Sequence, residues 1–363
     1  MTIHTPGSPG RCASGEAGEA PECRCSLVAM NPTRYCAAPM TSSLLPGPSG
    51  LTTESEFPAR EWPEVPLWTE NYCYVCYDPS SEIGIWTHLG RAPFDPTLWR
   101  ELSMIFLPTG ERLVNKGYGR SETGRGPGGA TLSYECVEPW NQWRSRRDGA
   151  AIRTTVKELD AGMLFDRAHE RVAFELTWQG DGPVWDWGEV EDAHGWGKLH
   201  YEQLARVQGT VTVGGEPIPF DGAGLRDHTR GPRDFSVVVA HLWSWASFPS
   251  GRGFIVLHVV VDGQTLTRAV TLEDGELVTQ TLANSPVLSS RAQCADPYVL
   301  ELGEHRIGAE ILHLLPNGFE GPNDICLGYD PTVTTTANFE GMSRFEWGGE
   351  VGYGLTERSV RMT

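Results

Sequence analysis

The chain has 363 residues, a formal net charge of −18 at pH 7 and 39% hydrophobic residues. So acidic a surface repels phosphate backbones and anionic lipid, which argues against nucleic-acid binding. The sequence has no run of the ~18 apolar residues that a transmembrane helix needs, and its N-terminus lacks the charged and apolar segments of a secretory signal. We therefore expect a cytoplasmic protein with about two domains of ~100–200 residues each.

Residues 1–50 are rich in glycine, proline and serine, a composition typical of disorder. Met30 and Met40 offer alternative translation starts. We expect this segment to be a disordered leader that need not belong to the native fold. Its cysteines lack the paired spacing of a zinc site; they are Cys12, Cys23, Cys25 and Cys36.

Residues 51–70 are an extended, proline-punctuated lead-in, and from Asn71 the sequence has the pattern of successive short strands. β-Branched or aromatic residues alternate with polar ones, and turn-forming residues interrupt them at ~8–14-residue spacing, as in a β-sandwich or β-barrel. Cys73 and Cys76 lie three apart in one such strand and should face opposite sides, which favours core thiols over metal ligands or a redox pair. Further expected strands are Ile83–His88, Glu101–Pro108, Arg112–Gly119, Ala130–Glu138, Trp143–Glu158 and Val172–Gln179.

Residues 180–198 differ in composition, because Trp185, Trp187 and Trp196 lie there among acidic residues and glycines. We expect an ordered loop or short helix whose tryptophans cover an apolar opening. The strand pattern resumes near His200 and continues to the C-terminus, with Asp-Gly pairs that predict hairpin turns. The sequence therefore predicts an all-β fold in two successive runs of strands.

The most polar part of this second run, Gly222–Asp234, is the first candidate for chemistry. It stands between two strand-like stretches, so we expect a loop aimed into or across an apolar barrel. Asp227 and His228 are adjacent in it, and Glu202 is placed to return alongside it on a neighbouring strand. Burial in an apolar cavity raises the pKa of a carboxyl group, which can then stay protonated and act as a general acid.

Other interpretations of these residues remain open. Asp227 could pair with a neighbouring arginine, which would lower its pKa and prevent an acid role. Trp243 and Trp245 are two apart and should share one strand face, where they either pack in a core or form a ligand wall whose π faces stabilise a developing cation. The sequence contains no nucleophile elbow, phosphate loop or paired-histidine metal motif.

Three segments, His200–Gln203, Gly209–Val213 and Gly222–Asp234, together resemble the lipocalin-like two-barrel superfamily. This superfamily includes carotenoid 1,2-hydratases, AttH-like proteins and tocopherol-cyclase-like enzymes. Its members carry a loop of the type Arg-Asp-His-Ser/Asn-Trp-Gly-x-Arg-Asp before a Trp-rich strand. The resemblance implies two consecutive lipocalin-like antiparallel β-barrels, 51–199 and 200–363, with a hydrophobic cavity at or between them.

The resemblance also implies a cofactor-independent enzyme, with neither a metal nor an organic cofactor. It would be a hydratase, dehydratase, isomerase or cyclase acting on an isoprenoid, terpenoid, polyene or steroid-like molecule. Asp227 would be the general acid, His228 its orienter and Glu202 a further catalytic candidate. The expected substrate-binding residues are Trp187, Tyr201, Gln203, Arg230, Trp243 and Trp245. The alternative is a non-catalytic lipocalin-like carrier of a hydrophobic ligand.

Arg230 stands where the superfamily usually has tryptophan. A cation at this position would replace one aromatic wall and hold Asp227 ionised. It would suit an oxygenated substrate better than a pure hydrocarbon, because a guanidinium binds carbonyl, phenolate or carboxylate groups.

Overall fold

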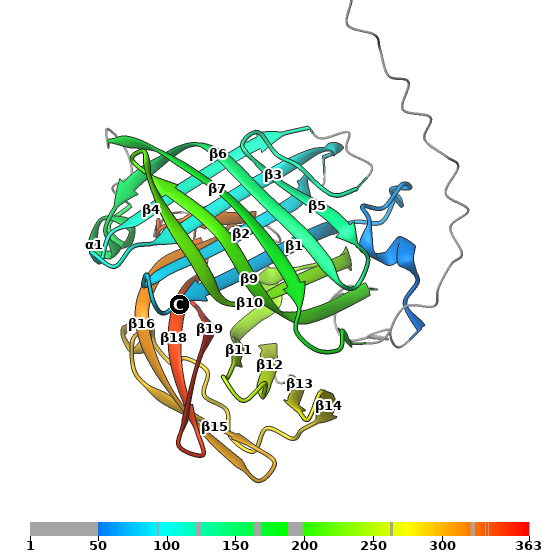
Figure 1. Cartoon of the computed structure of the whole chain (residues 1–363), viewed down its shortest axis with the longest axis vertical. Coiled ribbons are helices and arrows are strands. Elements are labelled where there is room, and N and C mark those ends of the chain that lie inside the picture. Colours follow the sequence, from blue (N-terminus) through cyan, green and yellow to red (C-terminus); the bar gives the residue numbers. More distant parts are fainter. Residues whose placement is uncertain are drawn as a thin grey trace, which may run out of the picture. The chain divides into compact units, whose positions relative to one another are not determined.

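Two antiparallel sheets make up the protein (Figure 1). The computed structural model describes residues 50–92, 94–120, 125–162, 168–187, 199–261, 264–320, 324–330, 332 and 334–362. The expected leader, except Gly50, and Trp196 lie outside this part of the chain. The helical segments of the described residues are short, and none of them is long and apolar enough to cross a membrane. These segments are η2 Thr53–Glu56, α1 Val156–Asp160, η3 Phe235–Val237 and η4 Arg291–Gln293.

The first sheet closes into a barrel. Strand β10 pairs with β1 on one side and with β9 on the other, which completes a ring in the order β10-β1-β2-β3-β4-β6-β7-β9. Strands β5 and β8 pair with β6 and β9. The strands are β1 Trp68–Asp78, β2 Ile83–Ala92, β3 Asp95–Phe106, β4 Arg112–Gly119, β5 Leu132–Glu138, β6 Gln142–Thr154, β7 His169–Gly180, β8 Trp185–Asp186, β9 Leu199–Val213 and β10 Glu216–Pro232.

The second sheet has the order β14-β13-β12-β11-β19-β18-β16-β15, with β17 paired to β16. It curls round its own core, because Leu242 and Phe254 pack with Leu300 and Leu302 from the other end of the sheet. The strands are β11 Val238–Ser247, β12 Gly253–Val261, β13 Gln264–Glu273, β14 Glu276–Thr279, β15 Tyr298–Leu302, β16 His305–Glu320, β17 Asp324–Leu327, β18 Thr334–Trp347 and β19 Glu350–Arg361. The predicted all-β, two-barrel architecture is confirmed.

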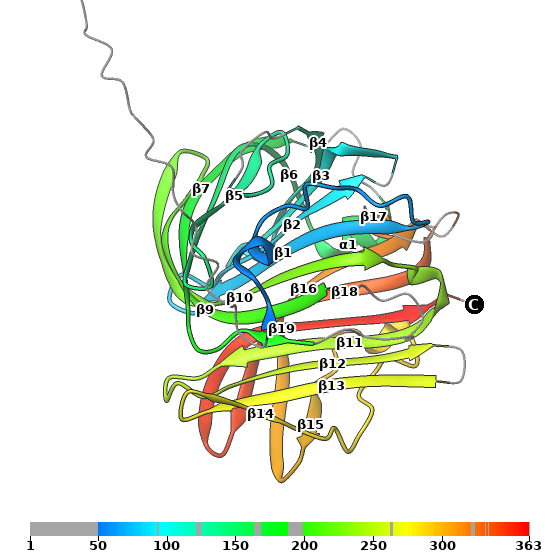
Figure 2. The ribbon, with the colours of Figure 1, turned by 90° about the vertical axis from the view of Figure 1, so that its right-hand side faces the viewer.

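The alternation of strand side chains gives the first barrel two buried faces. Cys76 packs in the barrel interior, whereas Cys73 lies in a second core that also contains Trp86 of β2 and Trp243 of β11. Both cysteines are free and buried, on opposite faces as predicted. The second core therefore joins the outer face of the first barrel to the second sheet, where β10 and β19 lie side by side (Figure 2).

Strand β10 overturns one prediction, because most of the expected loop Gly222–Asp234 belongs to this strand. Its cations are tolerated inside the barrel since buried acids neutralise them, Glu56 for Arg226 and Glu70 for Arg230. Local polarity cannot reveal such distant partners. The expected boundary at 199/200 is corrected as well, because β9 and β10 complete the first barrel and the chain enters the second sheet only after Pro232.

Candidate functional site

A cavity of about 90 Å³ lies between the outer face of the first barrel and the second sheet. This volume is below the ~150 Å³ that holds a benzene molecule, so a ring compound must widen the cavity or enter it in part. Its apolar wall consists of Trp86, Phe235, Trp243, Leu257, Phe319 and Ile325. Its ionisable side chains are Cys73, His88, Arg100, His200, Glu202, Asp227, Arg233, His241, Glu340 and Glu357.

One wall of the cavity carries a hydrogen-bonded group of three ionisable residues. Asp227 of β10 and Glu202 of β9 are register partners, and His200 lies two residues before Glu202 on the same strand face. Nε2 of His200 is 2.6 Å from Oδ2 of Asp227 and 3.2 Å from Oε1 of Glu202. The prediction that Glu202 returns beside Asp227 is confirmed.

Two further side chains support this group. The Thr229 hydroxyl donates a hydrogen bond of 3.1 Å to Oδ2 of Asp227. The Trp187 ring stacks on His200, with the ring centroids 3.7 Å apart. Both contacts fix the imidazole and the carboxylate in place, so Trp187 acts on the cavity through His200 rather than as part of its lining.

The electrostatics of the three groups assign the proton to His200. Burial raises the pKa of Asp227, but the charge and hydrogen bond of His200 outweigh it and lower that pKa below its usual value. Burial alone would lower the pKa of His200, yet Asp227 and then Glu202 raise it. Burial raises the pKa of Glu202, against the hydrogen bond from His200. The lowered pKa of Asp227 favours its ionised form, and it therefore favours a base over the expected general acid.

We expect His200→Gln to reveal this proton through the pH dependence of stability. The pKa of folded His200 is raised, so its stabilisation is complete below the unfolded pKa of ~6.5 and is lost as the pH rises through the folded value. The variant should lose about 1.5–3 kcal/mol at pH 6 and progressively less toward pH 9, measured by urea denaturation. His169→Gln, at an exposed position of β7, is the control, and an equal loss at both pH values would contradict the assignment.

The same three residues have the composition of a metal site. One ligand atom each from His200, Glu202 and Asp227 lies within 4.8 Å of the other two. A metal ion would require Nε2 of His200 to be free of its proton. In the structure this nitrogen lies between two carboxyl groups, where a proton satisfies both. The geometry therefore fits a proton-holding triad.

The facing wall carries a second acidic group, supplied by the second sheet. Glu340 of β18 and Glu357 of β19 are register partners and both line the cavity. Nε2 of His241, on β11, is 2.8 Å from Oε1 of Glu357. Arg233, between β10 and η3, also lines the cavity, and its charge acts on both Asp227 and Glu357. Carboxyl groups thus face the cavity from both sheets.

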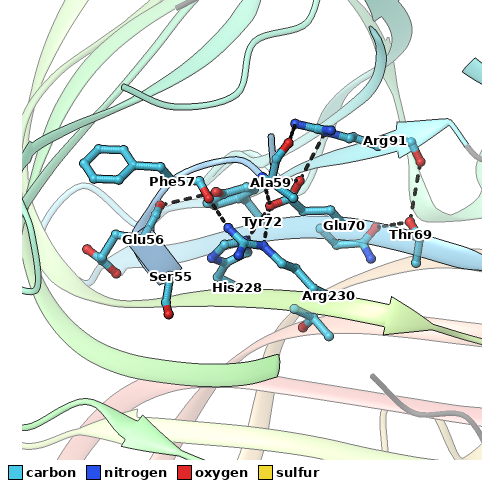
Figure 3. Close-up of polar contacts among 12 residues, drawn as sticks. Ser55, Glu56, Phe57, Ala59, Thr69, Glu70, Tyr72, Arg91, His228 and Arg230 are labelled. Carbon is cyan, nitrogen blue, oxygen red and sulfur yellow. Dashed lines mark hydrogen bonds and ion pairs between the residues drawn. The ribbon is translucent and has the colours of Figure 1, made fainter. Parts of the chain in front are cut away.

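Four predicted site residues do not line the cavity, namely Tyr201, Gln203, His228 and Arg230. Figure 3 shows His228 and Arg230 beside Glu70, and Tyr201 and Gln203 contact buried Glu56 and Arg226. They alternate with the cavity-facing residues of β9 and β10, which explains the error: a strand cannot direct adjacent side chains to one face. His228 is hydrogen-bonded to Glu70 (3.1 Å) and lies 2.9 Å from the Tyr201 hydroxyl, so it does not orient Asp227.

Arg230 binds a buried acid and a backbone carbonyl. Its Nε donates to Oε1 of Glu70 (2.7 Å), and its Nη2 contacts the carbonyl of Phe57 (Figure 3). Burial raises the pKa of Glu70, but the hydrogen bond from His228 and the charges of Arg230 and Arg91 outweigh it and bring that pKa to about 2. The guanidinium of Arg230 therefore neutralises a buried acid inside the first barrel.

Trp243 and Trp245 were expected either to form a ligand wall or to pack in a core, and the structure shows one residue in each place. Trp243 lines the cavity, whereas Trp245 is fully buried in the core between the sheets. Gln203 donates hydrogen bonds to the carbonyls of Trp140 and Gly182, and accepts one from Arg226. Its role in the structure is thus to hold loop backbone in place.

His200, Arg233, Glu340 and Glu357 are among the cavity residues that the sequence pattern did not single out. His200 had a detectable signal, since it is two residues from Glu202 and shares its strand face. Glu340 and Glu357 lie among apolar residues of two late strands, and only the sheet pairing brings them together.

Comparison with known proteins gives one family and several similar folds. A family model described as "Domain of unknown function (DUF7064)" matches residues 52–285. An AttH-like protein (NE1406) from Nitrosomonas europaea has a TM-score of 0.55 at 12% identity, over 84% of this chain and 98% of that one. Kievitone hydratase from Nectria haematococca has a TM-score of 0.51 at 12% identity, over 88% and 97%. CghA gives 0.51 at 12%, over 82% and 89%. No curated protein sequence matches the chain significantly.

Proposed function

The chain belongs to the DUF7064 family and has the lipocalin-like two-barrel fold, and we propose that it is an enzyme that transfers protons on a small organic molecule in the cavity between its sheets. The observation that carries the proposal is the Asp227–His200–Glu202 triad at the cavity wall. An ionised carboxylate beside a protonated imidazole supplies a base and an acid within one hydrogen bond.

The reaction we propose is the addition or elimination of water. Asp227 takes a proton from carbon or from water, and His200 holds the positive charge that keeps Asp227 ionised. A hydratase among proteins of the same fold supports this class, although the low identity carries only the fold. The substrate we propose is a terpenoid, polyene or steroid-like molecule whose reacting end enters the cavity, because the apolar wall favours a hydrocarbon body and the volume admits only part of it.

The ionisable lining also favours an enzyme over the carrier of a hydrophobic ligand. Buried ionisable groups are expensive to desolvate, and a carrier gains affinity from apolar area without them. A cavity with carboxyl groups on both walls therefore suits chemistry better than storage.

The test starts with a thermal-shift screen of terpenoid, polyene and steroid-like compounds, with and without hydroxyl groups. Compounds that stabilise the protein are then incubated in ¹⁸O-labelled water and examined by mass spectrometry for gain or loss of water. Asp227→Asn should reduce turnover roughly 100-fold, because it removes the base, while the ligand-induced thermal shift persists.

Asp221→Asn is the matched control, since Asp221 lies on the same strand but is exposed and paired with Arg206. This variant should turn over like the wild type. Ligands that bind tightly without any turnover, with binding reduced equally by both variants, would instead identify a carrier.

A further inference from the structure

Glu340 and Glu357 form a second acidic pair, which is separate from the triad. The two side chains are neighbours across β18 and β19, with 1% of Glu340 and 13% of the Glu357 side chain exposed. Both line the cavity on the side of the second sheet. Two ionised carboxylates in contact at such depth repel each other strongly, so one proton shared between them is the stable arrangement.

The hydrogen bonds of Glu340 show which oxygen carries that proton. Asn317 and Asn338 donate from Nδ2 to Oε1, at 3.2 and 3.0 Å. With both lone pairs of Oε1 engaged by N–H donors, a proton on this carboxyl group resides on Oε2. Oε2 is buried, and no hydrogen-bond donor reaches it from the part of the chain that the structure describes. A proton on Oε2 completes the group and can be offered either to Glu357 or to a ligand.

The charges around Glu340 agree with this assignment. Burial and the adjacent Glu357 raise the pKa of Glu340 well above its usual value, against the two asparagine donors. Three further groups of the site lie nearby: His241 of β11 binds Glu357, the charge of Arg233 acts on Glu357, and burial raises the pKa of the Cys73 thiol of β1.

We propose that Glu340, sharing its proton with Glu357, is the acid that faces the Asp227 base across the cavity, and that the substrate carries an oxygen function between them. This inference rests on the proposed function and names its second catalytic residue. Opposite protonation states in two carboxyl groups of one site are the usual mark of an acid and base pair. The substrate class narrows accordingly to alcohols and alkenes with an oxygenated reacting end.

Two protons move in the elimination direction. The Oε2 proton of Glu340 moves to the substrate hydroxyl, and the C–O bond breaks with its electron pair to release water. Asp227 takes the proton from the neighbouring carbon, and the C–H electrons form the C=C bond. Glu340 is left ionised and Asp227 protonated, and solvent restores both. Hydration is the reverse.

The proton on Glu340 can be tested without a substrate, by the melting temperature of Glu340→Gln from pH 4.5 to pH 8.5. Glutamine mimics a protonated carboxyl. The wild type loses stability as the pH rises from the unfolded pKa of ~4.3 toward the raised folded pKa, and the variant does not. We expect similar melting temperatures at pH 4.5 and a variant that melts a few degrees higher at pH 8.5.

Glu346→Gln is the control, at an exposed position of the same strand. The gap between wild type and Glu340→Gln should also shrink in a Glu357→Gln background, because the repelling charge is gone. A variant that melts lower than wild type by the same amount at every pH would overturn the shared proton.

The catalytic role is tested on any compound that the thermal-shift screen identifies as a substrate. Glu340→Gln should reduce kcat at least tenfold with little change in KM, and should remove the alkaline limb of the pH–rate profile. Unchanged kcat in this variant, with Asp227→Asn inactive, would overturn the acid role and leave the proposed function intact. If no compound is turned over, the proposed function fails, while the melting-temperature series still decides the protonation of Glu340.

Discussion

Glu56→Gln should lower the free energy of unfolding by about 3–5 kcal/mol, the loss expected when one partner of a buried ion pair is removed. Oε1 of Glu56 lies 2.7 Å from Nη1 of Arg226, and Oε2 accepts hydrogen bonds from the Trp143 indole and the Trp140 backbone. Glu56 and Arg226 are both buried inside the first barrel. Glutamine keeps the shape of the side chain but leaves the guanidinium without its counter-charge.

Urea denaturation of three variants measures this effect. Glu54→Gln is the control, because Glu54 is exposed in the same short segment η2; its change should stay within ~0.5 kcal/mol. The double variant Glu56→Gln/Arg226→Met should recover part of the loss, since the unpaired charge is then absent. A loss in Glu56→Gln no larger than in the control would show that the pair contributes nothing to the fold.

Arg233→Met should destabilise the protein by about 3 kcal/mol at pH 7 and by much less at about pH 3. The charge of Arg233 helps to lower the pKa of Asp227, after the contribution of His200. A lowered folded pKa gives stability that is present above the unfolded pKa of ~3.9 and is lost as the pH falls. Removing the cation therefore destabilises the protein most at pH values at which the carboxyl groups of the cavity are ionised.

The measurement is urea denaturation at both pH values, with Arg306→Met as the control. Arg306 is exposed and pairs with Glu301 on the surface, so its change should be small at either pH. A loss for Arg233→Met that is independent of pH would mean that the side chain acts by packing, for example against the Phe235 ring, rather than by charge.

Strand patterning predicted the fold because alternation and turn residues are local properties. The predicted strand Arg112–Gly119 has the bounds of β4, and the opposite facing of Cys73 and Cys76 followed from their spacing alone. The boundary between the sheets could not be predicted this way. It depends on β10 closing the first barrel, a pairing between segments about 150 residues apart.

Two of the three triad residues were predictable for a similar reason. Asp227 and Glu202 are polar residues in an apolar context, and their strands are neighbours in the chain. The protonation state was not predictable, because it depends on His200 and Arg233 lying beside Asp227 in the folded protein. Arg230 was misassigned since its partner, Glu70, is 160 residues away.

The side chains of β10 alternate between two environments, according to whether the residue number is even or odd. Even-numbered Arg226, His228 and Arg230 hold the acids inside the barrel, whereas odd-numbered Asp227 lines the cavity and Thr229 donates a hydrogen bond to Asp227. One strand thus carries two independent sets of side chains. Substitutions at the even positions therefore act on the barrel interior, whereas substitutions at Asp227 or Thr229 act on the group at the cavity wall.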